Sequence, residues 1–411
     1  MQSAIFENAR ILDGSSDEGE HDRFVRVADG FIKEISDKPI KDSSAHRIDL
    51  RGKTLMPGLI DCHTHIVSPL PDPADNARLP DSLIALHAAR IMKQMLLRGF
   101  TSIRDLGGAD VGFQRAVDQK IIEGPRLFIC GKAFVQTGGH TDVRQAFDGS
   151  DVETLNRRLG SVSRVVDGVE AVRFAVREEL RNGAQYIKVM AAGGAASGKF
   201  PILRLGFSRD ELLTFVEEAD KAQTYVCGHL YSDEAVKRAV EVGFQSVEHA
   251  TLVEPATAKL MAEKNVIVTP TIIAYESQKT EEKALHLDPG FSSRLDYVIK
   301  KSPESLEIMH KAGVKMAYGT DLLGFLHKYQ GAEFVIRGRT LPAIDVIRSA
   351  TLNAAELIRM SGKVGTVAVG AYADLIVVEK DPLKDLSALD EEGRYIPLVM
   401  KDGDFIKNVL N

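Results

Sequence analysis

Between residues 58 and 363 the chain alternates short apolar runs with longer amphipathic segments. The apolar runs predict eight strands, at 59–65, 100–105, 126–131, 185–191, 224–230, 246–250, 266–271 and 315–321. Helical periodicity follows several of them, at 82–98, 111–122, 209–222, 232–242 and 255–263. Apolar strands that alternate with helices are typical of a buried parallel sheet. Eight such units within about 270 residues favour a closed (β/α)8 barrel, the TIM barrel, over an open sheet.

The two ends of the chain show a different pattern, in which short β-like runs are broken by Gly, Asp and Ser. These runs lie at 4–12, 24–28, 31–35 and 46–49, and again at 365–367, 374–379, 395–400 and 404–407. Because both ends share this pattern and flank the barrel, we expect residues 1–57 and 364–411 to form one small β-sandwich domain. The barrel domain would then comprise residues 58–363, and the fold class is α/β.

Composition and charge narrow the classes of partner and location. The chain is 44% hydrophobic and 27% charged, which is ordinary for a globular protein. A net charge of −6 and a pI near 6.0 give no electrostatic footprint for nucleic acid or an anionic membrane. No run of about 18 uncharged apolar residues and no secretory signal is visible. The three cysteines, Cys62, Cys130 and Cys227, share no short spacing, so we expect a reducing compartment, the cytoplasm.

Polar residues occupy one end of the predicted barrel strands. His63 and His65 end the first strand and point to the same face, because side chains two apart on a strand do so. Five strands contribute six metal-compatible groups in this way: His63, His65, Lys188, His229, His249 and Asp321. A barrel places its active site at the carboxyl ends of its strands. The pattern therefore predicts a metal site at that rim.

Each of these residues also has a simpler explanation when taken alone. A single histidine at a strand end is usually structural, and Asp321 could cap a helix. Lys188 could be a surface lysine of an edge strand, but its neighbours from Tyr186 to Met190 are apolar, and a buried unpaired lysine is costly. Six such groups at the same strand ends favour the metal site over the separate explanations.

Two segments resemble signatures of the amidohydrolase superfamily. They are Met-Pro-Gly-Leu-Ile-Asp-Cys-His-Thr-His at 56–65 and Val-Gly-Thr-Val-Ala-Val-Gly-Ala-Tyr-Ala-Asp-Leu-Ile-Val-Val at 364–378. The resemblance covers essentially the whole chain and implies two divalent metal ions, with zinc expected. By this resemblance His63, His65 and Asp321 hold the first ion, and His229 and His249 hold the second. Lys188 would be N-carboxylated by carbon dioxide and bridge the two ions. Asp321 would be the catalytic acid and base beside a bridging hydroxide.

The reaction follows from a narrower resemblance. Deaminases of the superfamily usually carry His-x-x-Glu on the fifth strand, where this chain has Ser232, and they lack the bridging lysine. Lys188 also argues against the ring hydrolysis of the related imidazolonepropionases. The run Gly-Ala-Gln-Tyr-Ile-Lys-Val-Met-Ala-Ala-Gly-Gly at 183–194 resembles Xaa-Pro dipeptidases and carboxypeptidase-like amidases that act on ochratoxin-like N-acyl amino acids. We expect a homo-oligomeric hydrolase that cleaves the amide bond of a small dipeptide or N-acyl amino acid.

Four residues are candidates for substrate binding. His140 follows Gly138 and Gly139, whose backbone freedom would bring it close to the metals, where it would also assist catalysis. Tyr231 lies two residues past His229 on the same strand face. Arg104 and His327 follow the second and eighth strands, although Arg104 could instead pair with Asp105 and His327 could face water. The glycine-rich run 193–198 could act as a lid beside Lys188.

Two other functional classes stay open at this point. The same two-metal centre could serve a cyclic-amide, lactone or phosphotriester hydrolase, which turnover of a substrate panel would distinguish. A non-catalytic relative would retain the fold for assembly only. The complete set of predicted ligands argues against this class, because a scaffold has no need of them.

Overall fold

A computed structural model describes residues 3–147, 149, 151–195 and 200–410. Parallel strands form two sheets in the middle of the chain. The first contains β6 (Leu59–Thr64), β7 (Phe100–Asp105) and β8 (Arg126–Ile129). The second runs in the order β10 (Ser163–Val165), β9 (Ala133–Val135), β11 (Ile187–Val189), β12 (Val226–Ser232), β13 (Ser246–Leu252), β14 (Ile267–Thr269) and β15 (Lys315–Met316).

Hydrogen bonds on both sides join these two sheets into a ring. On one side the Cys62 amide donates to the Tyr318 carbonyl at 2.8 Å, just past β15. On the other side the Gln185 amide donates to the Ile129 carbonyl at 2.8 Å. The third predicted strand, 126–131, is observed as the shorter β8, which pairs with β7. β9, which was not predicted, follows it and pairs with β11 through Phe134 and Val189. The predicted parallel α/β architecture is confirmed, with the connectivity of a (β/α)8 barrel.

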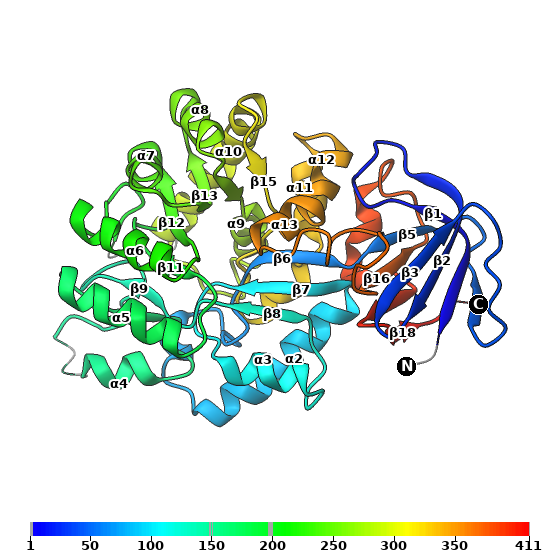
Figure 1. Ribbon diagram of the computed structural model, residues 1–411. Coiled ribbons are helices and arrows are strands. Elements are labelled where there is room, and N and C mark those ends of the chain that lie inside the picture. The colour runs from blue at the N-terminus through cyan, green and yellow to red at the C-terminus, as the bar shows by residue number, and fades with distance from the viewer. Residues whose placement is uncertain (1–2, 148, 150, 196–199, 411) are drawn as a thin grey trace.

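Helices cover the outside of this ring, as α5 to α8 do in Figure 1. The five predicted helices are confirmed as α2 (Asp81–Leu97), α3 (Val111–Asp118), α6 (Arg209–Lys221), α7 (Asp233–Val242) and α8 (Pro255–Glu263). The bounds agree within one residue except for α3, which ends at Asp118 although a helix was predicted over 111–122. Ser232 starts α7 as predicted, because its hydroxyl accepts from the Ala235 amide. The remaining helices are α1 (Pro73–Asn76), α4 (Val152–Arg157), α5 (Val169–Arg181), α9 (Ile272–Thr280), α10 (Pro289–Lys311), α11 (Ala332–Gly338), α12 (Ala343–Ser349) and α13 (Leu352–Leu357).

Both ends of the chain contribute to an eight-stranded sheet at one side of the molecule, where the blue and red strands lie together (Figure 1). Its strands are β1 (Ala4–Ile11), β2 (Glu20–Ala28), β3 (Phe31–Ser36), β4 (His46–Asp49), β5 (Thr54–Pro57), β16 (Leu375–Val378), β17 (Leu398–Lys401) and β18 (Asp404–Asn408). Antiparallel pairing of β5 with β16 connects the two ends. This sheet has a hydrophobic cluster of its own. The prediction of a strand at 365–367 was wrong, because the backbone turns at Gly365, which has φ +68°.

Two further features concern the described residues only. Within them, no helix combines the length and apolar character that a membrane crossing requires. The three cysteines are buried and free.

Candidate metal centre and active site

The barrel brings the six predicted metal-compatible residues to one end of its strands. His63 lies in β6 and His65 just after it, Lys188 in β11, His229 in β12 and His249 in β13, and Asp321 follows β15. Ligand atoms of His63, His249 and Asp321 all lie within 4.8 Å of one another. Side chains from the first and last barrel strands therefore meet, as the strand-end pattern predicted.

Asp321 lies between the two histidines of the first strand. Its Oδ1 is 3.3 Å from His63 Nε2 and 3.2 Å from His65 Nε2. Burial opposes ionisation of Asp321, but the two imidazoles outweigh it and hold the pKa of its carboxyl well below the ordinary value. His65 Nδ1 is turned the other way and donates to the Gly107 carbonyl at 3.4 Å. Both histidines thus direct Nε2 at an ionised carboxylate.

The other three groups form a nitrogen-rich cluster beside this trio. His249 Nε2 is 2.9 Å from His229 Nδ1, and their ring centroids are 4.6 Å apart. Burial lowers the pKa of both imidazoles well below the usual value, so both are neutral and able to coordinate a metal. Lys188 Nζ and His229 Nε2 are buried without a hydrogen-bond partner among the described residues. Unpaired buried nitrogens beside a carboxylate are a donor set that fits divalent cations such as zinc.

The backbone at this end of the barrel adopts conformations that are unfavourable for ordinary residues. His249 has φ +74°, Ala250 +52° and Asp321 +53°, all in the left-handed region. Such residues cluster at functional sites, where the surrounding structure holds them. Gly319 is required next to the site, because a Cβ there would approach His63 Cβ to 2.8 Å and Thr269 Cγ2 to 2.2 Å. The positive φ angles therefore set the directions of His249 and Asp321, and Gly319 leaves room for His63 beside them.

Arg104 does not reach the cavity, which corrects its prediction as a substrate-binding residue. Its side chain is fully buried inside the barrel, and its guanidinium donates to Glu248 Oε1 at 2.7 Å and to the Cys62 carbonyl at 2.7 Å. The other oxygen of Glu248 lies 2.9 Å from His63 Nδ1. Burial opposes ionisation of Glu248, but Arg104 and His63 outweigh it and lower the pKa of its carboxyl. The physical reason for the error is that Arg104 faces the barrel interior and finds a charge partner there.

His140 comes to the centre as predicted. Its ring stacks on His229, with centroids 4.4 Å apart and an interplanar angle of 21°. The opposite face is close to Gly194, where a Cβ would meet His140 Cε1 at 2.3 Å. Burial lowers the pKa of His140 to about 4, so the ring is neutral near pH 7. The glycine-rich run expected as a lid lies partly outside the described residues, at 196–199.

Tyr231 and His327 are close to the centre, but neither lines the cavity. The ring of Tyr231 stacks on His249 with centroids 4.7 Å apart, and its Oη is 2.7 Å from Tyr275 Oη. His327 lies in a 3-10 turn, η1 (Gly324–Tyr329), with both ring nitrogens buried and without a partner among the described residues. Burial lowers the pKa of His327 to about 3. The alternative that His327 faces water is wrong, because its side chain is buried, and its role in binding substrate stays a prediction.

Sequence reasoning missed three residues that contact the candidate ligands. Glu248 bonds to His63, while Thr271 Oγ1 and Tyr275 Oη lie 2.8 and 3.1 Å from His249 Nδ1. A signal existed for Glu248, since an acidic residue inside an apolar strand requires a charged partner. No pattern in the chain distinguishes Thr271 or Tyr275 from ordinary core residues.

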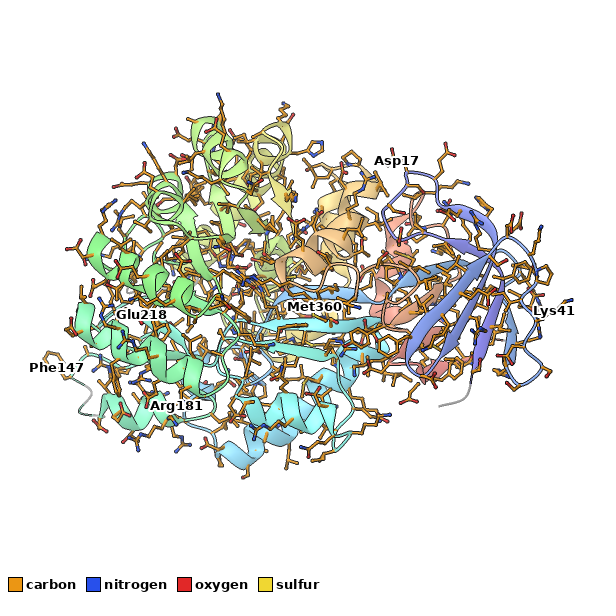
Figure 2. All side chains as sticks on the ribbon, in the orientation of Figure 1. Asp17, Lys41, Phe147, Arg181, Glu218 and Met360 are labelled. Carbon is orange, nitrogen blue, oxygen red and sulfur yellow. The ribbon has the colours of Figure 1, made fainter. Side chains whose placement is uncertain are left out.

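A cavity of about 500 Å³ opens onto this cluster. Its floor contains five of the six candidate ligands, all but His249, together with His140. Four segments of the chain supply the outer wall, which mixes polar side chains such as Asp72, Gln278 and Asp288 with apolar ones. The apolar residues include Pro71, Val143, Leu285, Leu287, Phe291, Leu323 and Leu326. Phe147, just beyond the second of these segments, projects away from the body of the molecule (Figure 2). The arrangement suits a small molecule with an apolar part and a polar group that reaches the floor.

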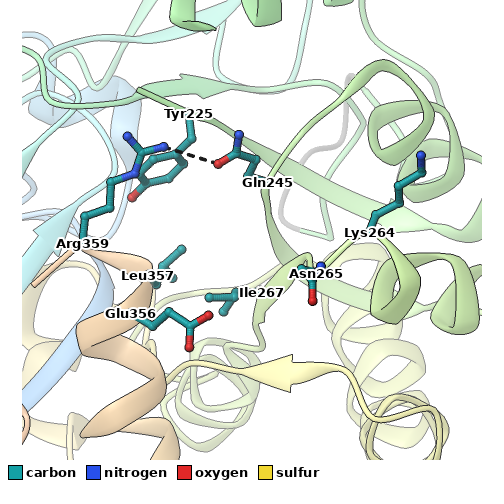
Figure 3. Close-up of a pocket in the computed structure, with 8 residues that line it drawn as sticks. All are labelled: Tyr225, Gln245, Lys264, Asn265, Ile267, Glu356, Leu357 and Arg359. Carbon is teal, nitrogen blue, oxygen red and sulfur yellow. Dashed lines mark hydrogen bonds between the residues drawn. The ribbon is translucent and has the colours of Figure 1, made fainter. Parts of the chain in front are cut away.

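A smaller hollow of about 300 Å³ lies elsewhere on the barrel, between Tyr225, Lys264, Glu356 and Arg359 (Figure 3). Arg359 Nη2 donates to Gln245 Oε1 at 3.4 Å, and its guanidinium lies 5.1 Å from the Tyr225 ring centroid. Most of its lining residues are exposed. Among the described residues, the metal-compatible group His63, His249 and Asp321 contributes two members, His63 and Asp321, to the larger cavity and none to this hollow.

Comparisons with known proteins agree with this architecture. The family model described as the amidohydrolase family matches residues 54–406. A crystal structure of an amidohydrolase is 43% identical with a TM-score of 0.96, and each chain covers 100% of the other. A prolidase complexed with N-methylphosphonate-L-proline is 41% identical with a TM-score of 0.96, covering 99% of this chain and 100% of its own. Ochratoxinase of Aspergillus niger is 29% identical over 398 residues, 92% of this chain and 80% of the relative.

The chain belongs to the amidohydrolase family. The expected class, a hydrolytic enzyme that acts on C–N bonds, is confirmed at this level.

Proposed function

We propose that this enzyme hydrolyses the amide bond of an Xaa-Pro-like dipeptide or an N-acyl amino acid, with two divalent metal ions, zinc expected. The observation that carries the proposal is the amine of Lys188, which has no hydrogen-bond partner among the described residues and is fully buried on the cavity floor among histidines and Asp321. A lysine in that place is stable if it reacts with carbon dioxide and becomes an anionic carbamate. Similarity to a prolidase at 41% identity supports the choice of an amide substrate.

The residues divide into two groups around the carbamate. His63, His65 and Asp321 would hold one ion, His229 and His249 the other, and N-carboxylated Lys188 would supply an oxygen to each. When bound, a pair of divalent cations polarises a carbonyl and lowers the pKa of water. Asp321 would accept the proton of the attacking water and deliver it to the leaving nitrogen. The two imidazoles hold the pKa of its carboxyl below the ordinary value, so Asp321 is in the ionised form that this role requires.

His140 and Tyr231 are the proposed substrate-binding residues. A pKa of about 4 leaves His140 neutral, with one ring N–H that can donate to a carbonyl or carboxylate oxygen of the substrate. Its Nδ1 is buried without a partner among the described residues. Tyr231 stacks on His249 outside the cavity lining, and its hydroxyl would reach a substrate only by exchanging its contact with Tyr275 Oη for one with the substrate.

We also propose that residues 1–57 and 364–411 form a separate β domain, which the independent hydrophobic cluster supports. The homo-oligomeric state stays a prediction.

A substrate panel tests the proposed reaction. Purified enzyme loaded with Zn²⁺ would be assayed against Xaa-Pro dipeptides, other dipeptides and N-acyl amino acids, beside lactones, cyclic amides and phosphotriesters. We expect turnover of at least one of the first three groups and little of the others. Turnover confined to lactones, cyclic amides or phosphotriesters would replace the proposed function with that of the alternative hydrolase. The Asp321→Asn variant controls for contaminating peptidases.

A further inference from the structure

Glu248 is a buried carboxylate that contacts a candidate metal ligand from below. It lies in β13, immediately before His249, and its side chain is fully buried inside the barrel. Oε2 is 2.9 Å from His63 Nδ1. Oε1 accepts from Arg104 Nη2 at 2.7 Å and from Ser246 Oγ at 2.9 Å. Both oxygens are therefore engaged, and one of them is directed at His63.

The contact determines which nitrogen of His63 carries the proton. An ionised carboxylate only accepts hydrogen bonds, so Nδ1 must carry hydrogen and donate it to Glu248. With Nδ1 held by Glu248, Nε2 is the ring nitrogen left to coordinate a metal, and its lone pair is available when no proton is bound there. Nε2 lies 3.3 Å from Asp321 Oδ1, the carboxylate proposed to hold the same ion. Glu248 thus orients the ring so that Nε2 points at the proposed metal position.

Arg104 in turn holds Glu248 in place. The guanidinium is fully buried and donates to acceptors from several neighbouring strands. These are Cys62 O in β6, Tyr225 Oη just before β12, Ser246 Oγ and Glu248 Oε1 in β13, and Thr269 Oγ1 in β14. A planar, permanently charged group with so many fixed acceptors has little freedom to move. The Glu248 carboxylate consequently cannot turn away from His63 without breaking its buried ion pair with Arg104.

We propose that Glu248 is a positioning residue for the metal centre, which fixes the tautomer and the ring direction of His63, with Arg104 as its anchor. Outer partners of metal-ligating histidines act in this way generally, and their loss lowers metal affinity about 10- to 100-fold. The inference rests on the proposed function, because it requires His63 to be a ligand of the first ion.

The barrel contains a matched control for this pair. Glu333 and Arg337 are also fully buried, and Arg337 Nε donates to Glu333 Oε1 at 2.7 Å, the same distance as between Arg104 and Glu248. Glu333 accepts from the Ile273 amide and touches none of the six candidate ligands in the described structure. A Glu333→Gln variant therefore reproduces the loss of a buried carboxylate beside arginine without touching the proposed metal site.

The test measures metal affinity and stability separately on metal-free protein. Wild type, Glu248→Gln and Glu333→Gln would be titrated with Zn²⁺ against a chromophoric chelator, and the free energy of unfolding of each would be measured in urea. We expect both variants to be less stable than wild type. Only Glu248→Gln should lose Zn²⁺ affinity, about 10- to 100-fold at one of two sites. Glu248→Asp, which keeps the charge, should recover part of that affinity and serves as the readout if Glu248→Gln does not fold.

Three results would decide against the proposals, each in a distinguishable way. Equal Zn²⁺ affinity in wild type and Glu248→Gln, or in wild type and Glu248→Asp if only that variant folds, would overturn the positioning role. Equal losses in Glu248→Gln and Glu333→Gln would overturn it too, because the effect would then be one of stability alone. Failure of wild type to bind Zn²⁺ tightly would instead contradict the proposed function.

Discussion

Asp321 and His63 are connected twice, once through the backbone and once through the side chains. The Asp321 amide donates to the His63 carbonyl at 2.8 Å, and Asp321 Oδ1 lies 3.3 Å from His63 Nε2. The backbone bond is part of the contact that closes the barrel between its first and last strands. The same closure that completes the fold therefore fixes the position of the proposed catalytic carboxylate relative to the proposed metal ligand.

Replacing Asp321 by asparagine keeps the shape of the side chain and removes its charge and basicity. We expect kcat to fall about 100- to 10,000-fold, the usual contribution of a positioned general acid or base. The variant would be measured with its metal content determined in parallel, so that lost metal is distinguished from lost proton transfer. Asp118→Asn, on the exposed face of α3, is the control and should retain wild-type kcat. An Asp321→Asn enzyme with full metal content and wild-type kcat would exclude the proposed role.

Substituting Gly194 by alanine should act on the enzyme through His140. The new Cβ would lie 2.3 Å from His140 Cε1, so the ring must leave its place between Gly194 and His229. A displacement of about 1 Å in an active site can cost on the order of 100-fold in rate. We expect a decrease of that order in kcat/KM with little change in the unfolding midpoint. Gly149→Ala, where nothing lies within 4 Å of the added Cβ, should have no effect.

A double variant tests whether His140 carries this effect. If Gly194→Ala acts only by displacing the ring, then adding it to His140→Ala should change kcat/KM no further, because the two losses share one cause. Additive losses would show that Gly194 matters for another reason.

Lys188 should be replaceable in part by a soluble carboxylic acid. We expect Lys188→Ala to lose most activity and to regain part of it in formate or acetate, whose carboxylate can take the place of the carbamate. Lys132 is the control, because it is a half-buried lysine whose Nζ donates to the carbonyls of Arg158, Leu159 and Ser161. Lys132→Met should lose stability and gain no activity from either acid. A fully active Lys188→Ala enzyme would refute the bridging carbamate.

The strand-end residues show how far the sequence alone leads. His63, His65, Lys188, His229, His249 and Asp321 could be placed at one rim because parallel barrel strands all end there, and the fold brings them together. Their service as metal ligands stays a prediction. Short β-like runs also predicted seven strands of the terminal sheet, but they missed β5, which joins the two ends of the chain, and they wrongly added 365–367, where Gly365 turns the chain.

The sequence did not predict which way individual side chains point from their strands. Arg104 lies near the end of an apolar strand, as His63 does, but it extends into the barrel interior to Glu248 instead of toward the cavity. The partners of His249, Thr271 and Tyr275, come from the end of the next strand and the helix after it, and only the three-dimensional register brings them into contact. β9, a short strand that follows the third predicted strand, likewise depends on its pairing with β11.

His327 should make the metal-free protein sensitive to acid. Burial lowers its pKa to about 3, whereas an unfolded histidine titrates near about 6.5. Between these values the unfolded chain binds a proton that the native state does not, so stability falls as the pH drops below about 6.5. The slope is at most about 1.4 kcal/mol per pH unit for one such histidine. The free energy of unfolding would be measured in urea at pH 7, 6 and 5. Its decrease with falling pH should be smaller in His327→Gln by the uptake of up to one proton. His46→Gln, at an exposed position, should leave the slope unchanged. Identical slopes in wild type and His327→Gln would mean that His327 takes up its proton without unfolding.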